Sequence, residues 1–230
     1  NNGVGVAVYG GGLQHAIRRN AMFENGGLGI DLEWNGFTLN DPLDADPGAN
    51  RRQNFPQFQS VAITGGNLIV TYLVDSSPAN ATYPLAVDFF KPDSVASFEG
   101  KTFVAGDSYS AADFTFGAKT VNLGNAVALG VAVGSRLVAM ATDAAGNSSE
   151  FSLTFGVTGP AQTFVVNSTN DFDDGACDVT HCSLREAIDA ATTNLPAVDS
   201  IRFGIPGAPP YVIQPQSPLP DSNTVNRKPP

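Results

Sequence analysis

A short motif near the N-terminus occurs twice. The segment NGVGVAV at residues 2–8 returns in altered form as NGGLGIDL at residues 25–32, which aligns Val6 with Ile30 and the glycines before them. A step of about two dozen residues is typical of solenoids, in which successive coils stack by parallel strand pairing. Because one or two coils bury too little apolar surface to stand alone, we expect other parts of the chain or a partner to cover both ends of the column.

The composition favours short strands joined by turns. The 230 residues include 24 Gly, 16 Pro and 42% hydrophobic residues, which is enough for folded cores with many turns between strands. Acidic residues outnumber basic ones by 22 to 12, so the phosphate backbone of a nucleic acid is repelled. No apolar run approaches the roughly 20 residues that a membrane span needs. We therefore predict a mostly β segment with no nucleic-acid partner and no membrane span.

The two cysteines, Cys177 and Cys182, lie close together in the run CDVTHC. A metal site needs more ligands than these two thiols, and a redox pair needs the spacing C-x-x-C, so a local disulfide is the favoured interpretation. A disulfide places the chain in an oxidising compartment, outside the cell or at its surface. The chain starts in the middle of a pattern and without Met, so we expect a mature protein or a part of something longer.

The run IRRNAMFENGGLGIDL, followed by NDPLDADPGANRRQNFP, resembles the terminal coils of right-handed parallel β-helix repeat proteins. Such repeats occur in large bacterial and archaeal surface proteins. The resemblance implies a last coil that ends near Leu32, then an acidic loop, then an Ig-like sandwich. Related coils in polysaccharide lyases and hydrolases carry catalytic acids on several consecutive coils, and too few coils are present here to form such a groove.

The acidic loop concentrates hard oxygen donors in a short segment. These donors are Asp41, Asp44, Asp46 and Asn50. Gly48 allows a tight turn between them, and oxygen-rich loops of this kind are what Ca²⁺ prefers. The loop has no bidentate Glu at its end, and its two prolines fit the alternative, in which the carboxylates accept hydrogen bonds from backbone N–H groups. We expect the hydrogen-bonded alternative, and Ca²⁺ is the candidate cofactor of this loop if it holds an ion.

Evenly spaced strands follow from Val61 to Val157, which is what an Ig-like sandwich needs. The expected strands are VAITGG, NLIVTYLVD, PLAVDFF, KTFVAG, DFTFGA, SRLVAMATD and EFSLTFGV. Gly65 and Gly66 predict a hairpin between the first two. The run VAMATDAAGNSSEFS resembles the last hairpin of bacterial Ig-like domains, with a turn from Asp143 to Asn147.

The run CSLREA, from Cys182 to Ala187, resembles the segment of that name that begins the β-helix of many surface and polymorphic outer-membrane-type proteins. Ser183 and Glu186 form a capping box, and the apolar residues that follow occupy one face of a short helix. Such a helix is suited to closing the open end of a solenoid. The runs DSIRFGIP and YVIQPQSPLP are then expected to be the first strands of the new coil.

Three further groups of residues carry side chains that function could use. His181 is adjacent to Cys182, but neighbouring side chains point apart and a disulfide-bonded Cys is no nucleophile. Four aspartates form a second acidic cluster that we expect to be a solvated loop, although it has the ligands that Ca²⁺ needs. They are Asp171, Asp173, Asp174 and Asp178. Trp34 and Phe37 either form a sugar-stacking platform or, as we expect, cover the end of the last coil.

These patterns predict an all-β chain of right-handed parallel β-helix rungs and an Ig-like antiparallel β-sandwich, with one short capping helix. The expected domains are the terminal coils and acidic loop (1–50), the sandwich (51–158), and the CSLREA segment with the start of a further β-helix (159–230). We expect a non-enzymatic extracellular structural protein, a segment or subunit of a cell-surface stalk or fibre. Its partners would be copies of itself, joined head to tail, or adjacent domains of a longer chain. The alternative is an adhesin or a carbohydrate-binding or carbohydrate-active module that recognises surface glycans.

Overall fold

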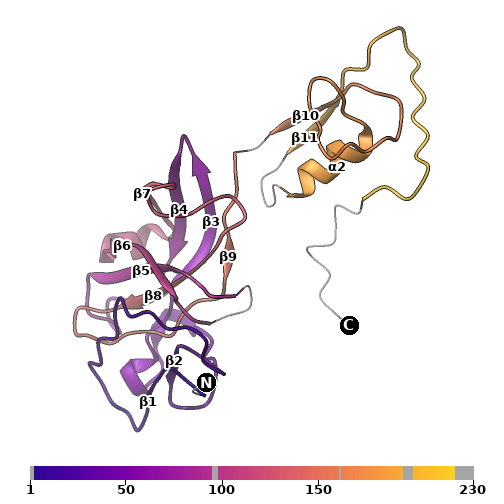
Figure 1. Ribbon diagram of the computed structural model, residues 1–230. Helices are drawn as coiled ribbons and strands as arrows, with labels where there is room; N and C mark the ends of the chain where they lie inside the picture. The colour runs from indigo at the N-terminus through magenta and orange to yellow at the C-terminus, as the bar shows by residue number, and fades with distance from the viewer. Residues whose placement is uncertain (1–2, 95–97, 161, 194–198, 221–230) are drawn as a thin grey trace. The chain divides into compact units, whose positions relative to one another are not determined.

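The computed structural model describes residues 3–94, 98–160, 162–193 and 199–220. The chain divides into two compact units, Asn1–Val157 and Thr158–Pro230, and Figure 1 shows the elements of each. The secondary structure is mostly β, with antiparallel sheets and few helical residues, as the composition predicted. Among the described residues, neither α-helix has the length and apolar character required to cross a membrane. The division into three domains stays a prediction.

The first unit begins with a pair of parallel strands. Strand β1 (Val6–Val8) pairs with β2 (Ile30–Leu32) in the register that the sequence repeat predicts, with the first residues of both strands opposite each other. Gly5 is required at this close approach, because a Cβ atom there would lie 2.6 Å from the carbonyl oxygen of Gly29. One parallel pair is consistent with stacked coils, and the extended β-helix stays a prediction.

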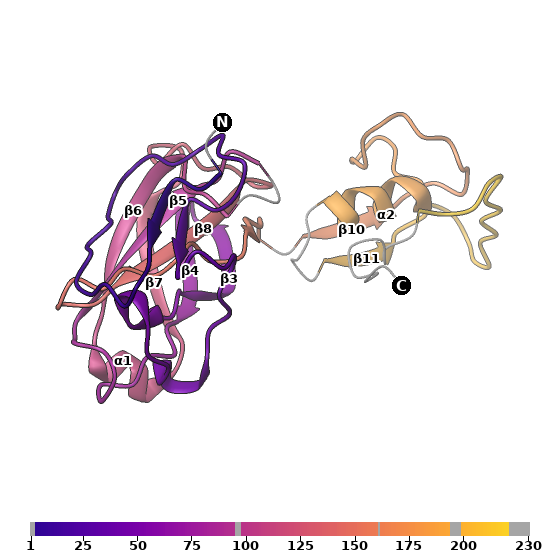
Figure 2. The same cartoon turned by 90° about the horizontal axis from the view of Figure 1, so that it is seen from below.

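A two-layer antiparallel sandwich forms the rest of the first unit (Figures 1 and 2). One sheet has the order β3 (Gln57–Thr64), β4 (Asn67–Leu73) and β7 (Lys119–Asn125). The other has the order β6 (Thr102–Tyr109), β5 (Leu85–Lys91), β8 (Arg136–Thr142) and β9 (Phe155–Gly156). Fully buried side chains from both sheets, such as Leu68, Tyr72 and Phe89, fill the space between them.

A second apolar core joins the coil, which we define as residues 3–32, to the sandwich. It combines residues of the coil and Ala49 with residues of β5, β8 and the segment that follows β8. The buried members are Val8, Met22, Ile30, Leu32, Ala49, Phe90, Val138, Met140 and Phe151. The sandwich therefore covers one end of the strand pair, which is the covering that two short coils were expected to need.

Two local predictions in the sandwich are confirmed and one is wrong. The hairpin at Gly65–Gly66 and the turn at Asp143–Asn147 are both present. The run DFTFGA is not a strand, because it lies largely in helix α1 (Ala111–Phe116), which a capping box between Ser110 and Asp113 begins. The strand of that region is β7, in which Val121 and Leu123 alternate with polar residues and which the sequence patterns above do not predict.

The second unit contains another parallel pair and a helix (Figures 1 and 2). Strand β10 (Thr163–Val166) pairs with β11 (Ser200–Phe203), and α2 (Leu184–Thr193) packs its apolar face against them. The expected capping box is present, since Ser183 N donates to Glu186 and Glu186 N donates to Ser183 Oγ. The run YVIQPQSPLP at 211–220 forms no strand, because its three prolines cannot donate to a ladder.

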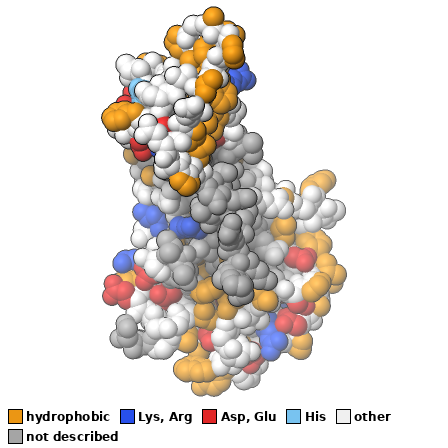
Figure 3. All heavy atoms as spheres, turned by 90° about the vertical axis from the view of Figure 1, so that its right-hand side faces the viewer, with side chains coloured by type: hydrophobic (Ala, Val, Ile, Leu, Met, Phe, Trp, Pro, Cys, Tyr) orange, Lys and Arg blue, Asp and Glu red, His pale blue; other side chains and the backbone are white. Residues whose placement is uncertain are grey.

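The second unit also exposes apolar side chains. Hydrophobic residues gather on the part of its surface that Figure 3 shows. The large exposed residues of this unit are Val165, Phe172, Val179, Phe203 and Val212. Two of them belong to the parallel pair, so part of β10 and β11 faces solvent with apolar side chains.

Candidate functional site

The strand pair at the start of the chain has two unlike edges. On the outer edge of β2, Leu32 N donates to Glu150 Oε1 and Thr38 N donates to Glu150 Oε2, both at 2.9 Å. Glu150 follows β8 in sequence and is buried, so a carboxylate of the sandwich occupies the place where a further strand would pair. Strand β1, by contrast, has β2 as its only strand partner in the part of the chain that is described.

Residues of β1 line two hollows, each of about 500 Å³. One is lined by all of β1, Tyr9 and residues 14–17, and the other by Gly5, Val6 and residues on both sides of Asn20. Residues 14–17, which line the first hollow together with β1, are anchored to the sandwich, because Gln14 N donates to Asn147 Oδ1 and Ile17 N donates to Ser148 Oγ. Strand β1 therefore lies beside an anchored segment, and the space between them is partly apolar.

Glu150 makes the stability of this edge depend on pH. Burial raises the pKa of Glu150 from 4.5 to about 7. Between these two values the folded chain holds a proton that the unfolded chain has released, so the free energy of unfolding should fall as the pH rises from about 4.5 to 7. We expect Glu150 to account for about 2–3 kcal/mol of that fall, by the conversion of 1.36 kcal/mol per pKa unit.

Urea unfolding at several pH values would measure this dependence, with Glu150→Gln as the control that keeps the shape and cannot titrate. The variant should show a flatter profile over pH 5–7 than the native chain. Two parallel profiles would show that Glu150 does not titrate in this range.

The acidic loop brings together three of its four predicted residues. Ligand oxygens of Asp41, Asp44 and Asp46 lie within 4.8 Å of one another, around the short 3-10 helix η1 (Pro42–Asp44). Asn50, in the 3-10 helix η2 (Ala49–Arg52), is not part of this cluster and forms hydrogen bonds with other segments. Its amide accepts a bond from His15 N and donates to the carbonyls of His15 and Ser148, so it anchors the coil to the sandwich instead.

Asp44 is the buried member of this cluster, with an exposed fraction of 3%. It accepts hydrogen bonds from Gln53 Nε2 and Asn54 N, and burial raises its pKa to about 7. Oxygen Oδ1 of Asp41 and Oδ1 of Asp46 are buried and have no hydrogen-bond partner among the described residues. The other Asp46 oxygen pairs with Arg52 at 3.2 Å. Some carboxylate oxygens of the loop thus accept hydrogen bonds, as the alternative to Ca²⁺ requires, and two have no donor among the described residues.

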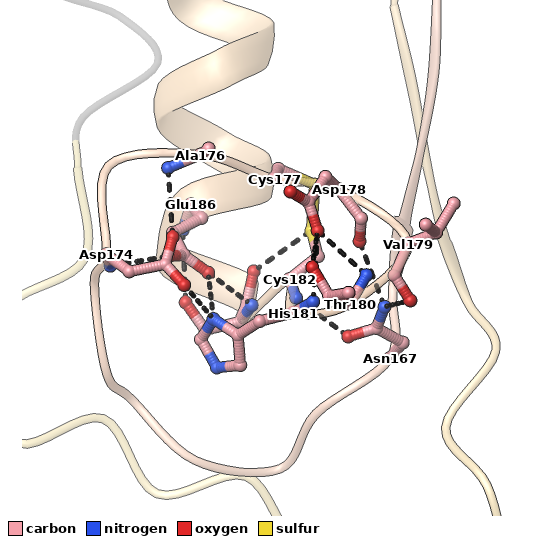
Figure 4. Close-up of a disulfide and its surroundings, with 11 residues drawn as sticks. Asn167, Asp174, Ala176, Cys177, Asp178, Val179, Thr180, His181, Cys182 and Glu186 are labelled. Carbon is pink, nitrogen blue, oxygen red and sulfur yellow. Dashed lines mark hydrogen bonds and ion pairs between the residues drawn. A yellow bond between two sulfur atoms is a disulfide. The ribbon is translucent and has the colours of Figure 1, made fainter.

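A second cluster lies beside the disulfide that joins Cys177 to Cys182 (Figure 4). The side chains of Asp174, His181 and Glu186 converge there, with their ligand atoms within 4.8 Å of one another. The sequence predicts that the aspartates of this region form a solvated loop and that Glu186 belongs to a capping box. Glu186 does cap the helix, but its carboxylate also faces His181, a contact that no local sequence pattern indicates.

Two other aspartates that the sequence placed in this acidic region, Asp171 and Asp178, have protein partners. Asp171 forms two hydrogen bonds with the guanidinium of Arg185, which holds the pKa of Asp171 below its usual value. Asp178 accepts bonds from the hydroxyl and backbone N–H of Thr180 and from His181 N, and these bonds lower its pKa. These two side chains stabilise the loop itself.

The two predicted aromatic residues differ in their surroundings. Phe37 packs against Phe55 and Phe98, with ring centroids 5.2 Å and 4.5 Å away. Trp34 is 65% exposed and makes an edge-to-face contact with Tyr9, which is 67% exposed. Phe37 is therefore part of an aromatic cluster, whereas Trp34 and Tyr9 form an open aromatic pair, and the covering of the last coil stays a prediction.

Comparisons with known proteins give one weak structural similarity and no family. No protein-family model matches the chain, and no curated protein matches it. The chain is weakly similar to the solved adhesin domain of Epf from Streptococcus pyogenes, with 12% sequence identity and a TM-score of 0.33. That match covers 46% of this chain and 33% of the adhesin domain, so the chain spans about a third of its length.

Proposed function

We propose that this chain is a non-enzymatic structural module of an extracellular stalk or fibre, which adds further strands at the free edge of β1. The observation that carries the proposal is the contrast between the two edges of the strand pair. Glu150 occupies the edge of β2, so the column ends against the sandwich on that side. The disulfide between Cys177 and Cys182 is compatible with an oxidising, extracellular location.

Backbone geometry supports strand addition at β1. Val6 N donates to Gly29 O and Val8 O accepts from Glu33 N, so alternate residues of β1 face β2. The N–H and C=O of Ala7 therefore point to the opposite edge. An edge strand with unpaired backbone groups is a template for another strand, and contacts of this heterologous kind build fibres. The partner is a strand of a further coil, from another copy or from an adjacent segment.

The substitution Ala7→Pro tests this proposal. Proline removes the outward N–H of Ala7 and leaves the bonds of Val6 and Val8 to β2 in place. We expect the native chain to form larger species as its concentration rises, and Ala7→Pro to remain monomeric with an unchanged fold. Light scattering coupled to size exclusion, with negative-stain imaging, would measure this. Ala7→Thr keeps the N–H and should assemble like the native chain.

A native chain that remains monomeric without filaments at high concentration would contradict self-assembly. Assembly that is equal in Ala7→Pro and Ala7→Thr would place the contact elsewhere.

The acidic loop is proposed as a Ca²⁺ site that stiffens the joint between coil and sandwich. Support comes from the three close carboxylates and from the two buried oxygens, on Asp41 and Asp46, that lack a donor. An ion that binds only the folded chain raises its stability by about 2.7 kcal/mol at 100 times its dissociation constant. We therefore expect thermal unfolding at a higher temperature in excess Ca²⁺ than in chelator.

Asp46→Asn should remove this difference, and Asp173→Asn is the matched control on the other acidic segment. Equal unfolding temperatures in Ca²⁺ and chelator would show that the loop is held by its hydrogen bonds alone.

A second candidate function is carbohydrate binding through Trp34 and Tyr9. It is supported by their exposure and edge-to-face contact, because sugars stack on open aromatic rings. Trp34 is the only tryptophan of the chain, so its fluorescence would report a bound oligosaccharide directly. A glycan array with Trp34→Ala as the control, and a screen for polysaccharide cleavage, would test binding and catalysis separately. Negative results in both would remove this candidate.

A further inference from the structure

The imidazole of His181 is held in one tautomer. Its Nε2 lies 2.9 Å from Asn170 Oδ1, and the same oxygen accepts a hydrogen bond from Phe172 N at 3.2 Å. Because two groups converge on it, this atom of Asn170 is the acceptor and Nε2 carries the hydrogen. The other ring nitrogen, Nδ1, is then available to a proton or to a metal ion. A fixed ring orientation with the far nitrogen hydrogen-bonded is the usual arrangement of a metal-binding histidine.

The Nδ1 atom of His181 faces two carboxylates, those of Asp174 and Glu186 (Figure 4). Nδ1 lies 3.1 Å from Glu186 Oε2 and 3.3 Å from Asp174 Oδ2. Nδ1 is nevertheless a buried atom that makes no hydrogen bond of acceptable geometry within the described part of the chain. Both oxygens are thus close to Nδ1 without forming a regular hydrogen bond with it. Two carboxylates around one ring nitrogen are stable only when a cation, either a proton or a metal ion, lies between them.

These distances fit a tetrahedral ion. Zinc binds His nitrogen at about 2.0–2.1 Å and carboxylate oxygen at about 2.0–2.2 Å, so two ligands on a tetrahedral zinc lie about 3.3–3.5 Å apart. The spacings of 3.1 Å and 3.3 Å from Nδ1 are close to that value. Ca²⁺ fits less well, because it takes oxygen ligands and this set contains an imidazole nitrogen.

The three side chains are held in place before any ion binds. Glu186 is 3% exposed, and its two oxygens accept bonds from Ser183 N and Asp174 N at 2.7 Å. Asp174 Oδ1 accepts a bond from Ala176 N at 3.2 Å. The disulfide closes the loop next to His181. Each ligand therefore has a second contact that orients it, which is what a metal site requires of its surroundings.

We infer that Asp174, His181 and Glu186 bind one divalent transition-metal ion, with zinc as the best fit. His181 Nδ1 and one oxygen of each carboxylate are the protein ligands, and water completes the tetrahedron on the side of Asp174, whose side chain is 42% exposed. The ion ties the loop that carries Asp174 to the first turn of α2. This inference is independent of strand addition at β1, since it concerns the second unit alone.

Zinc binding to the full chain, with its disulfide intact and after dialysis against chelator, tests the inference. Titration calorimetry and competition with a zinc indicator would measure stoichiometry and affinity. We expect one site that is weakened at least tenfold in His181→Gln. Asp174→Asn, at a partly exposed position, should weaken binding similarly without loss of folding, which circular dichroism would verify. His15→Gln replaces the other histidine and should bind zinc like the native chain.

Cobalt substitution adds a readout that affinity does not provide. Tetrahedral Co²⁺ absorbs strongly in the visible range, so the loaded chain should be coloured and His181→Gln should not be. Failure of the native chain to bind zinc at 1:1 would overturn the inference. Binding that survives in both His181→Gln and Asp174→Asn, or that depends on His15, would overturn it equally.

Discussion

Replacing Phe151 by alanine is expected to lower the free energy of unfolding by about 3–5 kcal/mol, the usual cost of removing a buried aromatic ring. Phe151 is 1% exposed and contacts Phe90 edge to face at 5.4 Å. Its ring also fills the space beside Gly29 and Gly100, where an added Cβ would lie within 3 Å of it. The ring therefore touches the coil on one side and the sandwich on the other, and its loss leaves a cavity between them.

Denaturant unfolding would measure this effect, with Leu153→Ala as the control. Leu153 is 56% exposed and follows Phe151 by two positions, so its truncation should change stability only slightly. Trp34 fluorescence reports the coil and circular dichroism reports the sandwich, and both should give the same midpoint if Phe151 unites them. A loss below about 1 kcal/mol, or two separate midpoints, would show that coil and sandwich are not one cooperative unit.

Replacing Arg18 by methionine is expected to cost about 2–4 kcal/mol, because it leaves a buried carboxylate without its main partner. Arg18 donates two hydrogen bonds of 2.9 Å to the oxygens of Asp88, which is fully buried in β5. Arg19 approaches the same carboxylate at 3.4 Å and compensates for part of the loss. Methionine keeps the apolar stem, so the measured loss reports the charge and its hydrogen bonds.

A double-mutant cycle with Asp88→Asn would isolate the pair, since the two substitutions should be less costly together than the sum of their separate effects. Arg51→Met is the matched control, because Arg51 makes one exposed bond to the carbonyl of Asn80. Additive effects of Arg18→Met and Asp88→Asn would contradict a direct coupling. The interaction matters for the proposed function because it fixes the segment that borders the free edge of β1.

Several local features followed from the sequence alone. The repeat predicted the register of β1 against β2, since glycines that permit close approach recur with the apolar residues beside them. Two adjacent glycines predicted the hairpin between β3 and β4, and the spacing of Ser183 and Glu186 predicted the start of α2. Each of these features depends on neighbours in sequence or on an internal repeat.

Other features needed the tertiary structure. The sequence predicted a strand at DFTFGA, where Ser110 and Asp113 begin a helix, because alternating aromatic residues fit both periods over so short a run. Asn50 looked like a ligand of the acidic loop, yet its amide bonds to His15 and Ser148, which lie far from it along the chain.

The features on which the two proposals rest divide in the same way between sequence and tertiary structure. The repeat by itself determined that β1 and β2 pair, because pairing within a solenoid is encoded by residues one period apart. Only the folded chain decided that Glu150 closes one edge, and that Asp174 and Glu186 meet at His181. The contact between Glu150 and Leu32 joins positions 118 residues apart, and the meeting at His181 depends on how the disulfide-closed loop folds back onto the start of α2. No simple pattern of neighbouring residues records either contact.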